Sequence, residues 1–441
     1  MTLSFGTDGV RGAASEALNP RFVNCLAVAA SEVLSVDRWV IGRDTRESGP
    51  ALSEAVIAAL ESMQRVAIDA GVAPTPTIAH LAKVEDCAGV VVSASHNPWT
   101  DNGIKIFAPG GRKLHDHEQT MIETRLNELL GDQSVTSLPV SSALRHPNPM
   151  GSWIESINAA LDNRTLNGMR LVVDCANGAA SEIADTLFSD LCAQVEIINA
   201  EPNGRNINDD CGSTNPAKLK AVVQSSQADL GLAFDGDADR LIAVASDGAI
   251  IDGDRQLCLF ANDMAQRDLL LERKVVITEM SNLGLRQALE LADISTIEVP
   301  VGDRNILAQL EEGAATLGGE QSGHIVFWDY ATTGDGLLSG ALLADLVVRS
   351  GQPSSDLARD AMLQLPQVLV NVPATVKSSD FPRKVQQEIQ AAQDRLTDNG
   401  RVLVRASGTE ALIRVMVEAP DERVARSEAQ RLADVIQAAM R

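Results

Sequence analysis

The segment VVSASHNPWTDNGIKIF, from Val91 to Phe107, carries several reactive side chains at the end of an apolar run. Ser95 offers a hydroxyl, His96 an imidazole and Lys105 an ammonium group. The apolar start predicts a buried strand, so we expect the hydroxyl and the imidazole at its carboxyl end. An unmodified serine is a weak nucleophile, and Ser95 lies outside any G-x-S-x-G turn, which disfavours a serine hydrolase.

Three aspartates alternate in GLAFDGDADRLIAV, at Asp235, Asp237 and Asp239. Every second side chain of an extended chain points the same way, so three carboxylates can converge on one hard cation. A calcium loop is disfavoured because its sixth residue would be Arg240 instead of glycine and its twelfth Ser246 instead of glutamate. The pattern therefore suits Mg²⁺. A solvated acidic turn is the alternative, and the apolar residues on both sides make it less favourable.

Two further segments combine polar side chains with glycine. In LGGEQSGHIVF, Glu320 and Ser322 are suited to hydrogen bonds with sugar hydroxyls, although a structural turn explains the pattern equally well. In RASGTEALIR, the run Ser407, Gly408 and Thr409 is flanked by Arg405 and Arg414. Amides, hydroxyls and guanidinium groups in such a loop predict a phosphate site, with a surface hairpin as the alternative.

The elements around these segments predict an α/β protein. Apolar runs that begin at Trp39, Ala88, Met169 and Lys274 each lead into turn residues and helix-like stretches, which is typical of buried strands in α/β units. The last block instead predicts two strands around a polar turn and then an amphipathic helix. Its apolar side is expected to carry Val424, Leu432, Val435 and Ile436. Turn-rich stretches divide the chain into four domains, predicted at residues 1–152, 153–253, 254–366 and 367–441.

Composition restricts the possible partners. The 441 residues are 45% hydrophobic and carry a net charge of −23, which disfavours nucleic acids and anionic membranes as partners. An anionic substrate would therefore need arginines gathered in a cleft. The start of the sequence resembles no secretory leader and no run is long and apolar enough for a membrane span, so we expect a cytoplasmic protein. Six scattered cysteines without a C-x-x-C pair predict reduced thiols that serve as packing residues.

Five motifs in a fixed order carry a resemblance to a known family. FGTDGVRG, SASHNPWTDNGIKIF, DGDADR, LGGEQSGH with TTGDG, and RASGTEALIR together resemble the phosphohexomutase superfamily over essentially the whole chain. This resemblance implies a heart-shaped, four-domain α/β fold. Three related α/β domains and a C-terminal α+β domain like the TATA-binding protein would surround a central cleft.

The resemblance also implies a mechanism. Ser95 matches the serine that carries the phosphoryl group, so it is expected as phosphoserine. One Mg²⁺ per chain would be bound by Ser95, Asp235, Asp237 and Asp239. Phospho-Ser95 would give its phosphoryl group to a hexosamine monophosphate, form a 1,6-bisphosphate, and take back the opposite phosphate. His96, Lys105 and Arg240 match positions beside the reacting phosphate, with His96 and Lys105 as candidates for proton transfer.

Substrate contacts follow from the same resemblance. Glu320 and Ser322 match contacts to the sugar's 3- and 4-hydroxyls, and His324 either supports their loop or contacts the substrate. The remaining expected substrate contacts are Arg11, Arg405, Ser407, Gly408, Thr409 and Arg414. Ala411 stands where the family commonly has proline, which predicts a less rigid phosphate loop and slightly tighter phosphate binding by Ala411→Pro.

The glucosamine branch of the superfamily fits best, on GEQSGH, VGDRN and TTGDG. The expected reaction is the interconversion of glucosamine 6-phosphate and glucosamine 1-phosphate through glucosamine 1,6-bisphosphate, which supplies UDP-N-acetylglucosamine for the cell wall. A homodimer is also expected. A phosphomannomutase/phosphoglucomutase and a catalytically silent sugar-phosphate-binding protein are the alternatives. Asp303 of VGDRN has two hypothetical roles, recognition of the amino group or pairing with Arg304.

Overall fold

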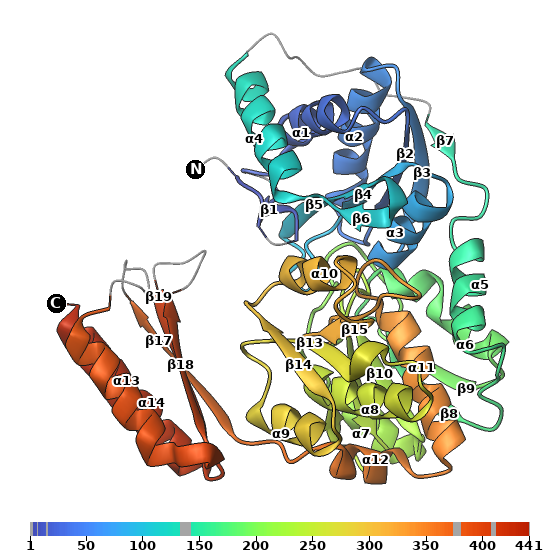
Figure 1. The fold of residues 1–441 in the computed structure, drawn as a ribbon. Helices are drawn as coiled ribbons and strands as arrows, with labels where there is room; N and C mark the ends of the chain where they lie inside the picture. Colours follow the sequence, from blue (N-terminus) through green and yellow to red (C-terminus); the bar gives the residue numbers. More distant parts are fainter. Residues whose placement is uncertain are drawn as a thin grey trace. The chain divides into compact units, whose positions relative to one another are not determined.

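The structure is a computed structural model that describes residues 3–6, 8–14, 16–132, 143–373, 381–406 and 412–440. It consists of two compact units (Figure 1). The first unit contains residues 1–280 and 293–361, and the second contains residues 281–292 and 362–441. No helix among the described residues is long and apolar enough to cross a bilayer.

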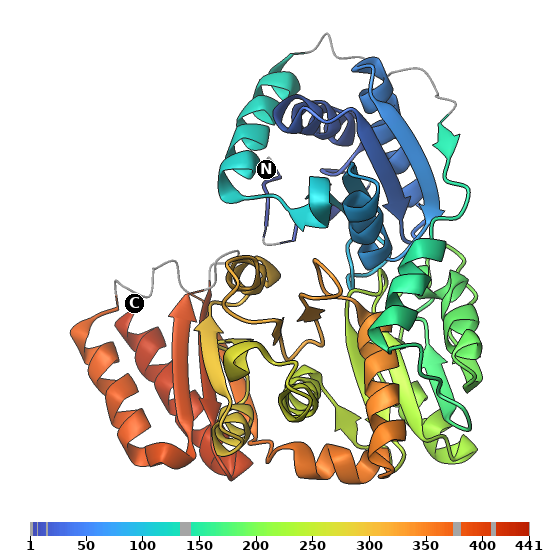
Figure 2. The same cartoon turned by 45° about the vertical axis from the view of Figure 1, so that its right-hand side comes forward.

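The first α/β domain has a seven-stranded sheet in the order β1-β5-β4-β2-β3-β7, with β6 paired to β5. Helices α1, α2 and α4 cover one face, and α3 packs on the other through Ile78 (Figures 1 and 2). Its elements are β1 (Val10–Ala13), α1 (Pro20–Leu34), β2 (Arg38–Arg43), α2 (Gly49–Ser62), β3 (Val66–Val72), α3 (Thr75–Val84), β4 (Ala88–Val92), β5 (Asp101–Ala108), β6 (Arg112–Lys113), α4 (Asp116–Gly131) and β7 (Leu144–Arg145).

The second α/β domain has a five-stranded sheet in the order β12-β11-β10-β8-β9. Every residue of β10 and β11 is buried, as their unbroken apolar sequences predict. The elements of this domain are α5 (Gly151–Ala160), β8 (Arg170–Asp174), α6 (Ala184–Asp190), β9 (Gln194–Ile198), α7 (Ala217–Ser226), β10 (Leu230–Phe234), β11 (Leu241–Ala245) and β12 (Ile250–Ile251).

The third α/β domain has a four-stranded sheet in the order β14-β13-β15-β16. The side chain of Asp335 caps the N-terminus of α11 by accepting a hydrogen bond from the Leu338 amide. The elements of this domain in the first unit are α8 (Gly253–Gln266), β13 (Lys274–Thr278), β14 (Ser295–Val299), α10 (Asp303–Glu311), β15 (Leu317–Gly319), β16 (Ile325–Phe327), α11 (Gly336–Ser350) and α12 (Ser354–Ala361).

The three sheets share one topology. In each sheet, a central strand (β2, β8 or β13) pairs in parallel with a strand on either side. One of these two outer strands then pairs with an antiparallel strand on its far side. The antiparallel pairs are β4 with β5, β10 with β11, and β15 with β16. The segment between the two strands of each pair holds one candidate motif: Ser95 and His96, then the three aspartates, then Glu320 and Ser322. The prediction of three related α/β domains is confirmed, and the repeated topology explains why the motifs occupy equivalent places.

The second unit is an antiparallel sheet in the order β17-β19-β18 with α13 and α14 side by side (Figure 2). Ala425 and Ala429 of α14 face the core, whereas Val424 is 45% exposed, so the predicted position of Val424 was wrong. The heart shape, the likeness to the TATA-binding protein and the boundaries after residues 152, 253 and 366 stay predictions. The elements are α9 (Leu283–Leu291), β17 (Gln367–Pro373), α13 (Arg383–Leu396), β18 (Arg401–Ala406), β19 (Leu412–Glu418) and α14 (Glu422–Ala439).

Five of the six cysteines are buried and all six are free thiols, which agrees with the prediction of reduced packing residues. Cys192 is the exception because its side chain is exposed.

Candidate active site

The Ser95 hydroxyl and the Asp235 carboxylate meet at the junction of the first two domains. Ser95 is fully buried, and its Oγ donates a hydrogen bond of 2.5 Å to Asp235 Oδ2. The serine has a left-handed backbone conformation, with φ at +56°, and its amide donates to Ser93 Oγ at 2.9 Å. This conformation is uncommon for a residue with a side chain. It directs the hydroxyl toward the aspartate loop instead of continuing the strand.

Asp235, Asp237 and Asp239 form the predicted cluster in the tight segment between β10 and β11. All three side chains are buried, and one oxygen from each lies within 4.8 Å of the others. Gly236 is required inside the cluster because a Cβ there would lie 2.7 Å from the Ser95 carbonyl oxygen. The interpretation of this segment as a solvated acidic turn is therefore wrong.

The chemistry of the cluster fits a divalent cation. Asp237 Oδ1 and Asp239 Oδ1 are buried and have no hydrogen-bond partner among the described residues. Burial, Asp239 and Asp237 together raise the pKa of Asp235 to about 8. Unpaired carboxylate oxygens in a dry site are costly, and a hard cation relieves both the missing partners and the mutual repulsion. The carboxylates of the three aspartates are placed to hold it.

Lys105 supplies a buried positive charge beside the aspartates. Its Nζ lies 2.7 Å from a carboxylate oxygen of Asp8, of Asp237 and of Asp239. Burial alone would lower the pKa of Lys105, but the nearby carboxylates raise it well above its ordinary value. Asp8 also pairs with Arg11 at 2.7 Å and with Lys113. The predicted residues Lys105 and Arg11 thus lie in one network of alternating charges.

His96 and Arg240 lie beside the serine hydroxyl. His96 Nδ1 is 3.4 Å from Ser95 Oγ and 3.2 Å from Arg240 Nη1. Burial and the charge of Arg240 lower the pKa of His96 to about 4, so its imidazole is neutral at neutral pH. Neighbouring carboxylates, chiefly Asp239, raise the pKa of Arg240 although burial opposes this. A neutral acceptor and a fixed cation therefore lie next to the serine.

The segment from Glu320 to His324 comes from the third domain. Ser322 Oγ donates to Glu320 Oε2 at 3.2 Å, and Glu320 Oε1 accepts the Gly302 amide at 3.0 Å. His324 is buried, with Nδ1 3.7 Å from Asp239 Oδ1. Its contact with a metal-site aspartate favours the supporting role over substrate contact for His324. The glutamate and serine are half-buried, so their free hydrogen-bonding capacity stays open to a ligand.

The Asp303 carboxylate contacts both Lys113 and the backbone of Arg304, whose amide donates to Asp303 Oδ1 at 2.8 Å. The contact with Lys113 is an ion pair, while the Arg304 side chain binds Asp116 at 2.7 Å and the Gly6 carbonyl at 2.8 Å. Asp303 therefore pairs with Arg304 through the backbone amide and not through the guanidinium group, and recognition of the amino group stays a prediction.

Arg405 and Arg414 belong to the second unit, where they lie opposite each other in the β18–β19 register. The other phosphate-loop predictions, Ser407, Gly408 and Thr409, lie outside the described residues, as does Ala411.

Several residues that surround the serine and the aspartates were not predicted from the sequence. Thr75 Oγ1 donates to Asp237 Oδ2 at 2.5 Å. Arg46 and Asn208 donate to the Ser95 carbonyl at 3.1 Å and 2.9 Å. A signal was present for Arg46, because GRDTR places charged residues directly after an apolar strand, at the position where the serine motif places its polar residues.

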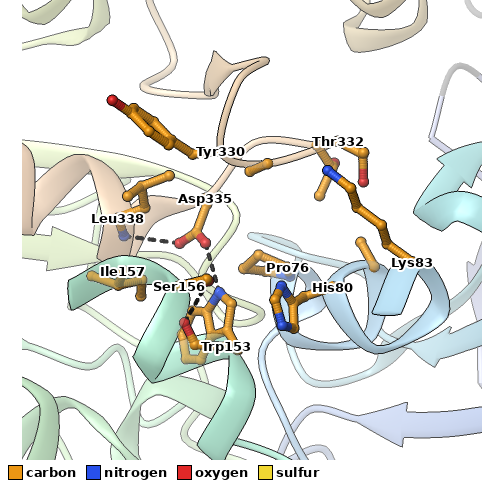
Figure 3. Close-up of a pocket in the computed structure, with 13 residues that line it drawn as sticks. Pro76, His80, Lys83, Trp153, Ser156, Ile157, Tyr330, Thr332, Asp335 and Leu338 are labelled. Atoms are coloured by element: carbon orange, nitrogen blue, oxygen red, sulfur yellow. Dashed lines mark hydrogen bonds between the residues drawn. The ribbon is translucent and has the colours of Figure 1, made fainter. Parts of the chain in front are cut away.

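A small cavity lies between α3, α5 and the segment before α11 (Figure 3). Its volume of about 20 Å³ has room for roughly one water molecule. Trp153 Nε1 donates to Asp335 Oδ2 at 2.8 Å at its edge, and Thr333 Oγ1 in its lining has no partner among the described residues. The cavity is too small for a sugar phosphate.

The chain matches four domain families along its length. The models for phosphoglucomutase/phosphomannomutase alpha/beta/alpha domains I, II and III match residues 2–130, 152–248 and 252–365. The model for the C-terminal domain of the same proteins matches residues 367–435. Together with three repeated sheets and a buried serine–aspartate site, these matches define a mutase of the phosphohexomutase class.

Individual relatives narrow the class. The chain is similar to the phosphoglucosamine mutase of Frankia alni, with 44% identity over 100% of this chain and 99% of the relative. It is also similar to that of Thermobifida fusca, with 45% identity over 99% and 98%. The chain therefore belongs to the phosphoglucomutase/phosphomannomutase family, and within it to the phosphoglucosamine mutases.

Solved structures agree on the fold. A phosphoglucomutase/phosphomannomutase family protein from Burkholderia thailandensis has a TM-score of 0.80 at 24% identity, covering 99% of this chain and 98% of that one. The Aspergillus fumigatus N-acetylphosphoglucosamine mutase, solved with GlcNAc-6P and magnesium, has a TM-score of 0.70 at 20% identity, covering 100% and 96%.

Proposed function

We propose that the protein interconverts glucosamine 6-phosphate and glucosamine 1-phosphate through a phosphoserine at Ser95. The contact of 2.5 Å between Ser95 Oγ and Asp235 Oδ2 carries this proposal, because it places the serine against the predicted metal ligands. The full-length likeness to phosphoglucosamine mutases supports the choice of substrate over a phosphomannomutase or a silent binding protein.

The phosphoryl group would move between Ser95 and the sugar. The bond between phosphorus and Ser95 Oγ breaks as the oxygen of the free sugar hydroxyl bonds to phosphorus. The sugar hydroxyl gives up its proton, Ser95 Oγ takes one up, and the product is glucosamine 1,6-bisphosphate. The bisphosphate then reorients, and the opposite phosphate returns to Ser95. Each step needs a proton acceptor and a fixed positive charge near the transferred group.

The residues around Ser95 are suited to these tasks. His96 Nδ1, neutral and 3.4 Å from Ser95 Oγ, is placed to exchange a proton with the serine oxygen as the phosphoryl group leaves or returns. Lys105, which remains charged, can donate one and can stabilise negative charge together with Arg240. Asp235, Asp237, Asp239 and Ser95 would hold one Mg²⁺ per chain. When bound, Mg²⁺ supplies charge neutralisation to the transferring phosphoryl group.

Substrate binding involves the other predicted residues. Glu320 and Ser322 would bind the 3- and 4-hydroxyls, which lie similarly in both orientations of the bisphosphate. Binding of phosphate by Arg11, Arg405, Ser407, Gly408, Thr409 and Arg414 is supported by the motif resemblance. A cytoplasmic location, a homodimer and a role in supplying UDP-N-acetylglucosamine are part of the same proposal.

Mass spectrometry of the intact protein with phosphopeptide mapping tests the mechanism. We expect one phosphate, located at Ser95, and loss of mutase turnover in Ser95→Ala with sugar-phosphate binding retained. Full turnover of Ser95→Ala with bisphosphate present would disprove the phosphoserine mechanism. Comparison of kcat/KM for glucosamine, glucose and mannose phosphates tests the substrate, and a preference for mannose 1-phosphate would overturn it.

A further inference from the structure

Two side-chain nitrogens from different domains hold the same pair of backbone carbonyls in the serine loop. Arg46 Nη2 donates to Ser95 O at 3.1 Å and to Asn97 O at 2.5 Å. Asn208 Nδ2 donates to Ser95 O at 2.9 Å and to Asn97 O at 3.2 Å. Arg46 precedes α2 in the first domain, whereas Asn208 lies between β9 and α7 in the second. The serine loop is therefore fixed by both domains at once.

Arg46 is itself held rigidly. Both Arg46 and Asp44 are 1% exposed, and Asp44 accepts hydrogen bonds from the Arg46 amide at 3.0 Å and from its guanidinium group. A buried guanidinium group needs such a carboxylate partner, because a buried charge without one is strongly destabilising. The pair places one guanidinium nitrogen, Nη2, on the two carbonyls of the serine loop.

The loop needs this support because its backbone is strained. Ser95 has φ at +56°, a conformation that is unfavourable for a residue with a Cβ. Released from the donors, the serine would favour an ordinary conformation, and its Oγ would leave Asp235. The four hydrogen bonds to the carbonyls oppose that change.

The second-domain loop that carries Asn208 is attached to the first domain at further points. Arg205 forms paired hydrogen bonds of 2.9 Å and 2.8 Å with Glu47, and its guanidinium carbon lies 5.1 Å from the centre of the Trp99 ring. The Glu47 amide donates to the Gly204 carbonyl at 2.9 Å. Asn208 is therefore carried to the serine loop by a loop that is itself well anchored.

We infer that Arg46 and Asn208 are positioning residues for phosphoryl transfer, because they hold the carbonyls of Ser95 and Asn97 and so keep the serine oxygen on Asp235. This inference rests on the proposed role of Ser95 as the phosphoryl carrier. Neither side chain is assigned to the phosphate or the sugar. Their effect is on the geometry of the serine and on its protection from water.

Loss of the hydrogen bonds from Arg46 and Asn208 to the serine loop should have two consequences. Transfer to the sugar slows, since a displacement of about 1 Å can reduce a rate by up to about 100-fold. Hydrolysis of the phosphoserine accelerates: a water oxygen bonds to phosphorus, the bond from phosphorus to Ser95 Oγ breaks, and Ser95 Oγ takes up a proton as inorganic phosphate leaves. A merely structural role would change neither the ratio of the two reactions nor the lifetime of the phosphoserine.

Asn208→Ala is the first test because Asn208 is half-buried. Its φ of +57° is less favourable for alanine than for asparagine, so urea unfolding of the variant is measured alongside its kinetics. We expect kcat to fall by about 10–100-fold with KM for the sugar phosphate changed less than about twofold. Intact-mass measurements over time should show faster loss of phosphate from Ser95. Asn208→Asp keeps the shape but faces two carbonyl oxygens with a carboxylate, so we expect a larger loss than in Asn208→Ala.

Asn206→Ala is the matched control, since Asn206 binds the Glu201 carbonyl and the Asn203 amide of its own loop and not the serine loop. Its kcat and phosphoserine lifetime should stay close to those of the wild type. Equal losses in Asn206→Ala and Asn208→Ala would assign the effect to the loop as a whole and overturn the inference. Wild-type kcat and phosphoserine lifetime in Asn208→Ala would overturn it as well. Absence of phosphate from wild-type Ser95 would instead disprove the proposed function.

Discussion

Thr75, the first residue of α3, holds Asp237 by both its side chain and its backbone. The Thr75 hydroxyl donates to Asp237 Oδ2 at 2.5 Å, and the Thr75 amide donates to the Asp237 carbonyl at 2.9 Å. The start of a helix in the first domain thus fixes a predicted metal ligand in the second. Groups that orient metal ligands commonly change metal affinity by about 10–100-fold when they are removed.

Thr75→Val should therefore weaken Mg²⁺ binding by about 10-fold, because valine has the shape of threonine but cannot donate to Asp237. Thr75→Ser keeps the hydroxyl and should bind Mg²⁺ almost as the wild type does. Isothermal titration with Mg²⁺ measures both variants without any need for turnover. Equal Mg²⁺ affinity in Thr75→Val and the wild type would show that the hydroxyl does not orient Asp237.

Lys105→Met should destabilise the metal-free protein by about 3–5 kcal/mol, since it leaves the carboxylates of Asp8, Asp237 and Asp239 without their shared cation. Mg²⁺ should restore part of this stability. The gain in stability on adding Mg²⁺ should be larger for Lys105→Met than for the wild type. Thermal unfolding with and without Mg²⁺ measures the difference. A fall in Tm that Mg²⁺ leaves unchanged would argue against a metal at this cluster.

The sequence predicted the parts of the site that lie next to one another along the chain. Alternation placed the three aspartates together, and the apolar run before Ser95 predicted β4, which ends at Val92, shortly before the serine. The repeated topology was visible as three similar blocks because buried parallel strands have a distinctive unbroken apolar pattern. The motif order then connected these local predictions to one family.

Contacts between domains could not be predicted in the same way. Thr75 and Asp237 are separated by 162 positions, and nothing in the residues near Thr75 indicates its partner. The same is true of Asn208 and the Ser95 carbonyl, at 113 positions. The prediction for Val424 was wrong for a different reason. Hydrophobicity favoured valine for the core side of α14, whereas the smaller Ala425 is the residue that packs there.

His96 should make stability depend on pH in the mildly acidic range. Its pKa is about 4 in the folded protein against an ordinary value of 6.5, so below about 6.5 the unfolded chain binds a proton that the folded protein does not. Stability is therefore lost as pH falls from about 6.5 to about 4. Solvent screening of this half-buried group limits the expected loss to about 1–2 kcal/mol.

His96→Gln removes the titrating group. The free energy of unfolding of this variant should therefore fall by about 1–2 kcal/mol less than that of the wild type over the same pH interval. Urea unfolding at several pH values, on protein freed of Ser95 phosphate and Mg²⁺, gives the two slopes. If the free energies of unfolding of the wild type and His96→Gln changed equally with pH, the pKa of His96 would not be lowered in the folded protein by burial and the charge of Arg240.

Trp153→Phe tests the link between the second and third domains at the edge of the small cavity (Figure 3). The indole donates to Asp335, whose other oxygen caps α11, and burial raises the pKa of Asp335 to about 6. Phenylalanine would leave that buried carboxylate oxygen without its donor, so we expect the free energy of unfolding to fall by about 1–3 kcal/mol.

Trp328→Phe is the control, since Trp328 is a half-buried tryptophan packed in the core of the third domain, and this change should cost less stability. Urea unfolding followed by circular dichroism compares the two without reliance on tryptophan fluorescence. Because the lost donor matters most when Asp335 is ionised, the difference should grow as pH rises through about 6, and a constant difference would mean that the indole contributes packing alone.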